Sequence, residues 1–261
     1  MTTQKDKLYF ASDFHLGVPD YSSSLVREKR IVSWLDEIKH DAKEIYLVGD
    51  IFDFWFEYKS VIPKGFVRLQ GKIAELVDAG TPIHFFTGNH DMWMFDYFQK
   101  ELGVHLHRSP ITVEHDGKSF YIGHGDGLGP GDKGYKFLKK IFSNRFFQWC
   151  FARIHPNLGI GIANYSSRKS RAKTGHSDEV FLGENEEWLV QYCKEVLQHK
   201  EVNYFVFGHR HLPLEITLSE NAKYVNLGEW INYNTYAVYE NGDLKLKSFP
   251  SNQLYSNHVN T

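Results

Sequence analysis

The sequence predicts a mixed α/β fold, a two-sheet β-sandwich flanked by helices. Three observations support this fold class: apolar runs of strand length recur, helical patterns separate them, and two Asx-Gly pairs join alternating segments. The chain has 261 residues, of which 42% are hydrophobic, so it is long enough to bury one sizeable core. We therefore predict a single domain over residues 1–261 that carries a helical insertion at residues 130–175.

The expected strands share a short apolar run that ends in Gly, Asp, Asn or His. They are Leu8–Ala11, Ile45–Val48, Pro82–Thr87, Phe120–Ile122 and Tyr204–Phe207. Leu25–Ile38 and Phe66–Val77 repeat apolar residues with the period of amphipathic helices. Asp116-Gly117 and Asn241-Gly242 are typical of hairpin turns. The sheets are therefore expected to be mixed rather than purely parallel.

Charge is distributed unevenly along the chain. The formal net charge is −2, but the segment Lys133–Lys173 holds ten Lys or Arg and no Asp or Glu, which leaves −12 for the remainder. An acidic protein usually avoids nucleic acid and membranes, so this basic segment is expected to meet the partner.

The sequence favours a cytoplasmic location with no membrane-spanning segment. Cys150 and Cys193 both lie in helical patterns with no partner nearby, which is typical of a reducing compartment. The polar stretch Met1–Lys7 lacks the apolar core of a secretory signal. No apolar run approaches the ~20 residues that span a bilayer, so we expect a protein that touches a membrane without crossing it.

Polar motifs follow the expected strands. They are Asp13-Phe14-His15, Gly49-Asp50, Gly88-Asn89-His90-Asp91, Gly123-His124-Gly125-Asp126 and Gly208-His209-Arg210-His211. A single Asp or His at a strand end is equally well explained as a turn residue whose side chain forms local hydrogen bonds. Together, however, Asp13, His15, Asp50, Asn89, His124, His209 and His211 match the oxygen and nitrogen ligands that Mn, Fe or Zn prefer.

Residues that are two apart in the motifs are expected to place their side chains on the same side of the chain. In an extended segment, Asp13 and His15 point the same way, and so do His209 and His211. Arg210 is then expected to point away from its neighbours, toward solvent or a substrate edge.

The ordered set of motifs resembles the calcineurin-like metallophosphoesterase superfamily. That resemblance implies two divalent cations, with Mn²⁺ expected and Fe or Zn as alternatives. One cation would be held by Asp13, His15, Asp50 and His211, and the other by Asp50, Asn89, His124 and His209. The shared carboxylate of Asp50 would bridge them, as suits two cations that clamp an in-line phosphoryl transfer.

Residues beside the ligands have expected roles as well. We interpret His90 as an acid or transition-state stabiliser, with Asp91 orienting its ring. Asp53 is equally compatible with holding a ligand histidine and with capping a turn.

The insertion combines aromatic and basic residues. A Gly-rich stretch, Gly125–Gly134, leads into an expected helix at Tyr135–Ile154, and a Gly-rich link at Gly159–Gly161 precedes more positive charge. An ordinary helix packed on both sides is one interpretation. The other is a lid whose apolar side receives acyl chains or the bilayer surface while its basic residues meet phosphates.

Within the superfamily, Asp132-Lys133-Gly134-Tyr135 and the Ser170-Arg171 region resemble the UDP-2,3-diacylglucosamine pyrophosphatases of lipid A biosynthesis. The resemblance implies a lipid-linked nucleotide-sugar substrate, water attack at its α-phosphorus, peripheral association with the inner membrane surface through the lid, and no stable nucleic-acid partner. It also implies substrate contacts by Tyr135, Arg168, Ser170 and Lys173. The family has arginine where this chain has His90, which makes the chemistry better supported than the substrate.

Three other functions fit parts of the pattern. A hydrolase of other nucleotides, phosphodiesters or phosphomonoesters would not need the apolar insertion. A nuclease acting on single strands would use basic and aromatic residues together. A protein-binding scaffold is disfavoured because no ligand position is lost.

Overall fold

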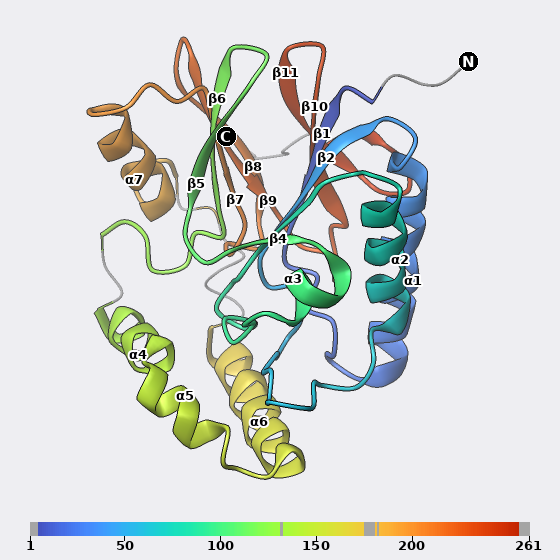
Figure 1. The fold of residues 1–261 in the computed structure, drawn as a ribbon. Coiled ribbons are helices and arrows are strands. Elements are labelled where there is room, and N and C mark those ends of the chain that lie inside the picture. Colours follow the sequence, from blue (N-terminus) through green and yellow to red (C-terminus); the bar gives the residue numbers. More distant parts are fainter. Residues whose placement is uncertain (1–4, 131–132, 175–180, 182, 256–261) are drawn as a thin grey trace.

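The computed structural model describes residues 5–130, 133–174, 181 and 183–255, without the side chains of 168–174. Its centre is a sandwich of two sheets (Figure 1). The first has the order β12-β11-β10-β1-β2-β3-β4 and the second β5-β6-β7-β9-β8. Mixed sheets flanked by helices confirm the predicted fold class.

In the first sheet, four parallel strands are extended by three antiparallel ones. The strands are β1 (Lys7–Ala11), β2 (Ala42–Val48), β3 (Ile83–Phe86), β4 (His105–His107), β10 (Thr235–Glu240), β11 (Asp243–Ser248) and β12 (Gln253–Leu254). In the second sheet, β6 and β7 run parallel. Its strands are β5 (Ile111–His115), β6 (Lys118–Gly123), β7 (Tyr204–Phe207), β8 (Pro213–Ser219) and β9 (Ala222–Leu227).

Helices cover the outer faces of the sandwich. The first sheet is covered by α1 (Tyr21–Ile38), α2 (Val67–Asp78) and α3 (Tyr97–Leu102), and the second by α7 (Trp188–Leu197) (Figure 1). Alternate residues of β1 serve two cores: Leu8 and Phe10 lie between the sheets, and Tyr9 and Ala11 face the helices. Burial on both faces explains why the parallel strands are continuous apolar runs.

The insertion consists of α4 (Lys133–Ser143), α5 (Arg145–Phe151) and α6 (Pro156–Thr174) at one end of the sandwich (Figure 1). The expectation of one helix over Tyr135–Ile154 was wrong, because Asn144 ends α4 and caps α5 by accepting from Phe146 N at 2.8 Å. The expected link at Gly159–Gly161 lies inside α6. A Cβ at Gly159 would stand 2.6 Å from the Tyr58 hydroxyl, so this glycine permits close packing rather than a linker.

Candidate metal centre

The five polar motifs meet at one rim of the sandwich. They follow β1, β2 and β3 of one sheet and β6 and β7 of the other, where parallel strands end on the same side. Residues from the two halves of the sequence are thereby brought together, as the sequence predicted.

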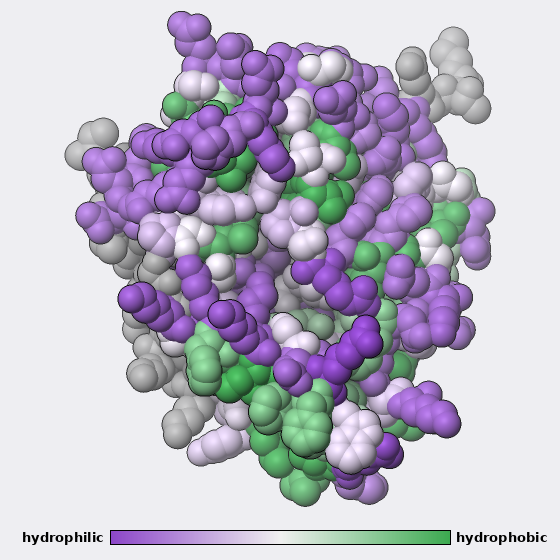
Figure 2. Space-filling model, turned by 60° about the vertical axis from the view of Figure 1, so that its left-hand side comes forward, coloured by the Kyte–Doolittle hydropathy of each residue, from purple (hydrophilic) through white to green (hydrophobic). Residues whose placement is uncertain are grey.

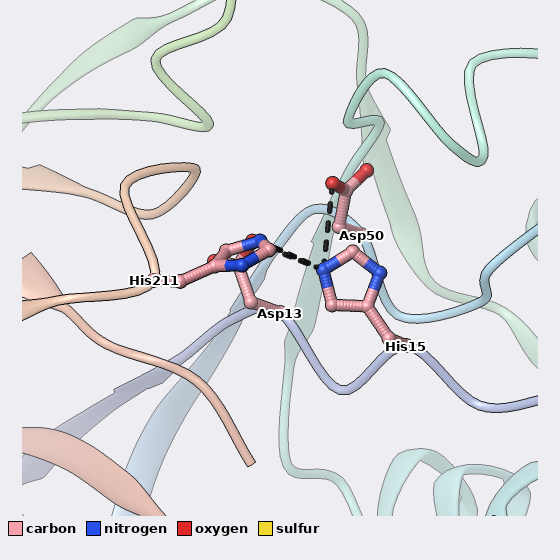
Figure 3. Close-up of side chains that lie close together, drawn as sticks. All are labelled: Asp13, His15, Asp50 and His211. Carbon is pink, nitrogen blue, oxygen red and sulfur yellow. Dashed lines mark hydrogen bonds and ion pairs between the residues drawn. The ribbon is translucent and has the colours of Figure 1, made fainter. Parts of the chain in front are cut away.

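The first group contains Asp13, His15, Asp50 and His211, whose ligand atoms lie close together (Figure 3). His15 Nε2 lies 2.9 Å from His211 Nε2 and 3.8 Å from Asp50 Oδ2. Asp13 Oδ1 lies 3.2 Å from His211 Nε2 and 3.6 Å from His15 Nε2. Two ring nitrogens and two carboxylates therefore converge on one point.

The second group shares Asp50 and adds His124 and His209. His124 Nε2 lies 3.3 Å from Asp50 Oδ2 and 3.2 Å from Asn89 Oδ1. The opposite ring nitrogen, Nδ1, donates to the carbonyl of Val48 at 2.9 Å. That bond fixes the tautomer and leaves the Nε2 lone pair directed at Asp50 and Asn89, as in a metal-ligating histidine.

The electrostatics of the rim favour a cation. Burial by itself raises the pKa of the Asp13 and Asp50 carboxyl groups, but the neighbouring histidines lower it below the ordinary value, so both stay ionised. Within the described residues, the buried Asp13 Oδ1 accepts no hydrogen bond, although His211 Nε2 lies 3.2 Å away. A buried, ionised oxygen of this kind requires a positive charge, and hard divalent cations fit such a donor set.

Several candidate ligands adopt a left-handed backbone. Among the described residues, ten non-glycine positions have positive φ, and five of them are Asp13, His15, Asp50, His209 and His211. The motifs are therefore not extended, and the alternation argument was wrong although the side chains do converge. Residues held in such conformations concentrate at functional sites, where the surrounding structure stabilises them.

Glycines allow the loops to approach one another. A Cβ at Gly88 would stand 2.2 Å from Asp50 Oδ1, and one at Gly208 would stand 2.4 Å from Asp13 Oδ2. These two glycines precede Asn89 and His209, so each ligand loop is packed directly against a carboxylate of another loop.

His90 lies beside the first group, with its ring 5.0 Å from that of His15. Its Nδ1 donates to the carbonyl of Asp53 at 2.9 Å. The Asp53 carboxylate lies 3.6 Å from His90 Nδ1 and 3.7 Å from His15 Nδ1. Asp53 therefore contacts a candidate ligand histidine, which favours that role over a turn cap.

Asp91 does not occupy the position expected for it. Its carboxylate accepts from the backbone amides of Gly88, Ile51 and Phe52 at 2.7, 2.8 and 3.3 Å. These bonds join the loop after β3 to the loop after β2. Asp91 thus fixes the loops beneath the site, and Asp53 rather than Asp91 orients the His90 ring.

Arg210 is buried, contrary to the expected solvent contact. Its Nε and one terminal nitrogen donate to Glu187 at 2.8 and 3.1 Å. Glu187 precedes α7, and only 2% of it is exposed. This two-point ion pair ties the His209–His211 loop to the start of α7.

Tyr135, one of the expected substrate contacts, lies at the rim. Its hydroxyl donates to Asp126 Oδ2 at 2.6 Å, and its ring centroid lies 6.3 Å from that of His209. The side chains of Arg168, Ser170 and Lys173 lie outside the described residues. Asp126 was missed by sequence reasoning, although its place in Gly123-His124-Gly125-Asp126 could have indicated it.

The insertion exposes a cluster of aromatic side chains. Phe137, Phe142, Phe146, Phe147 and Trp149 are all between 41% and 64% exposed. Figure 2 shows apolar side chains gathered at this end of the molecule. Phe151 instead packs inward against Phe54, Phe56 and Trp93. One side of the insertion is thus anchored to the loops of the rim, and the other faces solvent.

Several known proteins are similar to this chain. The family model for calcineurin-like phosphoesterases matches residues 7–213. A UDP-2,3-diacylglucosamine hydrolase of Porphyromonas gingivalis is 43% identical over 94% of this chain and 98% of that protein. A protein of the same name from Aeromonas hydrophila is 26% identical over 91% of this chain and 96% of its own length. A solved phosphoesterase of E. coli aligns with a TM-score of 0.48 at 16% identity, covering 96% of this chain and 97% of that one.

Among the described helices, none combines the length and the apolar character needed to cross a membrane.

Proposed function

The chain belongs to the calcineurin-like phosphoesterase family and is a metal-dependent hydrolase, and we propose that its substrate is UDP-2,3-diacylglucosamine. In this proposal, water attacks the α-phosphorus and breaks the pyrophosphate bond, which releases UMP and 2,3-diacylglucosamine 1-phosphate. The proposed substrate is supported by the 43% identity to a hydrolase of that name. The aligned region covers 94% of this chain and so includes the insertion as well as the rim.

Asp13, His15, Asp50 and His211 would hold one divalent cation, and Asp50, Asn89, His124 and His209 the other. Mn²⁺ is the expected ion, with Fe or Zn as alternatives. When bound, two such cations activate water and neutralise charge on the phosphate. His90 would donate a proton or a hydrogen bond to the reacting phosphate, since its Nδ1 is held by Asp53 and its Nε2 has no bond to any described residue.

The insertion would act as the lid that recognises the lipid. A groove of about 920 Å³ lies between α6, α1 and the loop after β2, and Phe54, Ile62 and Ile160 are among its apolar lining residues. Asp53 also lines this groove, so an acyl chain bound there would keep the sugar phosphate beside the rim. Tyr135, Arg168, Ser170 and Lys173 would contact the nucleotide, sugar or phosphate.

The exposed aromatic residues, together with Lys136, Lys140, Arg145 and Arg153, would bring the enzyme to the anionic inner membrane surface. This combination of apolar and basic side chains suits an interfacial helix pair. The enzyme would then be cytoplasmic and peripherally associated with the membrane.

The test is incubation of the Mn²⁺-loaded protein with UDP-2,3-diacylglucosamine in ¹⁸O-labelled water, followed by mass spectrometry of the products. Attack at the α-phosphorus places the label in UMP. A label in the diacylglucosamine 1-phosphate would show attack at the other phosphorus, and no cleavage would refute the proposed substrate.

A second candidate function is hydrolysis of another nucleotide or phosphodiester. It is favoured by His90, which stands where the lipid A enzymes resembled by the sequence have arginine. An unacylated UDP-sugar turned over as fast as the diacylated compound would support this alternative.

A further inference from the structure

Among the described residues, two buried carboxylates on the loops of the rim bond to side chains of the insertion. Asp126 contacts α4 and Asp53 contacts α6. Asp126 comes two residues after His124, and Asp53 comes three residues after Asp50. Each arm of the insertion therefore meets a carboxylate on the same short loop as a candidate ligand.

The first contact joins α4 to the second metal group. Asp126 is 6% exposed and accepts from the Tyr135 hydroxyl at 2.6 Å. Lys139 Nζ lies 2.6 Å from the same carboxylate and donates to the Asp126 carbonyl at 2.9 Å. An insertion that moved away would remove two donors from this carboxylate.

The second contact joins α6 to the first metal group. Asp53 is 2% exposed, and its Oδ2 accepts from the Ser167 hydroxyl at 2.8 Å. Its Oδ1 lies between His15 Nδ1 and His90 Nδ1, at 3.7 and 3.6 Å. Ser167 Oγ itself lies 3.4 Å from His90 Nδ1. One carboxylate thus contacts the insertion, a candidate ligand and the candidate acid.

We propose that Asp53 and Asp126 are positioning residues that couple docking of the insertion to assembly of the metal centre. This inference rests on the two-metal site of the proposed function. Removing a hydrogen-bond donor from a buried carboxylate costs free energy. Each carboxylate therefore has its full set of hydrogen bonds when the insertion is docked. The docked insertion in turn holds Asp53, which lies beside the rings of His15 and His90, and Asp126, which lies on the loop of His124.

Coupling of this kind is reciprocal. If docking strengthens metal binding, metal binding must favour docking by the same factor. The aromatic packing of Phe151 on Trp93 provides docking that is independent of the metal, so the two contributions are separable by removing only the hydroxyl donors.

The test measures hydrogen exchange of backbone amides with and without Mn²⁺, in the absence of substrate. Mn²⁺ should slow exchange in α4 and α6 of the wild type and of the controls Ser166→Ala and Tyr165→Phe, which alter exposed neighbours. The slowing should shrink in Ser167→Ala and in Tyr135→Phe, and it should shrink furthest in the double variant, which keeps only the Lys139 contact of the three side-chain contacts described above. Equal protection by Mn²⁺ in all proteins, or none in the wild type, would overturn the coupling.

Calorimetric titration of metal-free protein gives the reciprocal measurement. The double variant should bind Mn²⁺ about 5-fold or more weakly than wild type, a typical size for coupling between sites, and should keep two ions per chain. A wild-type stoichiometry of three would assign His15, Asp53 and His90 to a cation of their own and overturn the positioning role of Asp53. Because no lipid is used, failure here is distinguishable from failure of the proposed substrate.

Discussion

The rim and the insertion differ in how their side chains are held. At the rim, Asp13, His15 and Asp50 are fully or almost fully buried, and left-handed backbone and close glycines fix their positions. On the insertion, Phe142, Phe147 and Trp149 are 41–55% exposed; the Phe142 ring contacts Trp93, and the other two rings contact Phe146. Buried polar side chains in fixed positions are thus joined to a solvent-facing apolar surface. Variants of the two regions should therefore fail in different ways.

The largest effect is expected at the residue shared by both metal groups. Asp50→Ala should lose both ions and essentially all turnover, because Asp50 belongs to both candidate ligand groups and would be their shared anionic ligand. Metal analysis and activity assays measure both quantities, with Asp78→Ala at the exposed end of α2 as the control. Two ions retained by Asp50→Ala would remove the bridge from the proposal.

His90→Ala should separate chemistry from metal binding within the rim. We expect unchanged metal content and a loss of turnover of ~10²–10⁴-fold, typical of an acid–base group. An equally severe loss of metal would make His90 a ligand instead. His90→Arg sharpens the test, since recovery of lipid hydrolysis would show that arginine can serve at this position.

Glu187→Gln tests how much the buried ion pair beside the rim contributes to the free energy of unfolding. The change removes the charge of Glu187 from its buried ion pair with Arg210, so we expect the free energy of unfolding to fall by about 2–3 kcal/mol, at or below the low end for a broken buried pair. Denaturant unfolding of metal-free protein measures this, and Glu186→Gln is the exposed neighbouring control. A change confined to the metal-loaded protein would mean that the pair acts only through the ligand loop.

Polar substitution of Phe142, Phe147 and Trp149 tests the insertion. Loss of contact with two methylenes of an acyl chain costs about 1.6 kcal/mol, so KM for the diacylated substrate should rise about tenfold. A small phosphodiester should be hydrolysed as before. The exposed Val67 of α2, changed to serine, is the control, and an unaltered KM in the triple variant would argue against the lid.

The smallest expected effect lies in the sandwich, far in sequence from the insertion. A hydrogen bond from His84 is the main cause that lowers the pKa of Glu44 to about 2, below its ordinary 4.5. A lowered carboxyl pKa stabilises the fold above pH 4.5, and that contribution is lost as the pH falls toward 2. Glu44→Gln should thus cost about 1 kcal/mol at pH 6 and nothing near pH 2, whereas the exposed Glu114→Gln should cost little at either pH. A cost independent of pH would point to packing instead of charge.

The sequence by itself determined the strands of the rim, the flanking helices α1 and α2, and the order of the polar motifs. These features are local: a strand needs an apolar run, a helix needs its periodicity, and a ligand needs a suitable side chain where a strand ends. Short or polar elements such as β4, β12 and α3 carry too few residues for a periodic signal. The break at Asn144 was missed because the aromatic pattern continues across it.

Only the tertiary structure decided which partners the polar residues found. Asp91 bonds to amides about 40 positions away, Ser167 reaches Asp53 over 114 positions, and Arg210 pairs with Glu187 on another element. The left-handed backbone of the ligand loops is likewise imposed by their neighbours, since Asp and His do not require it locally. Sequence spacing fixes which side chains reach the rim, but their contacts depend on how distant segments pack, and that information lies in no single motif.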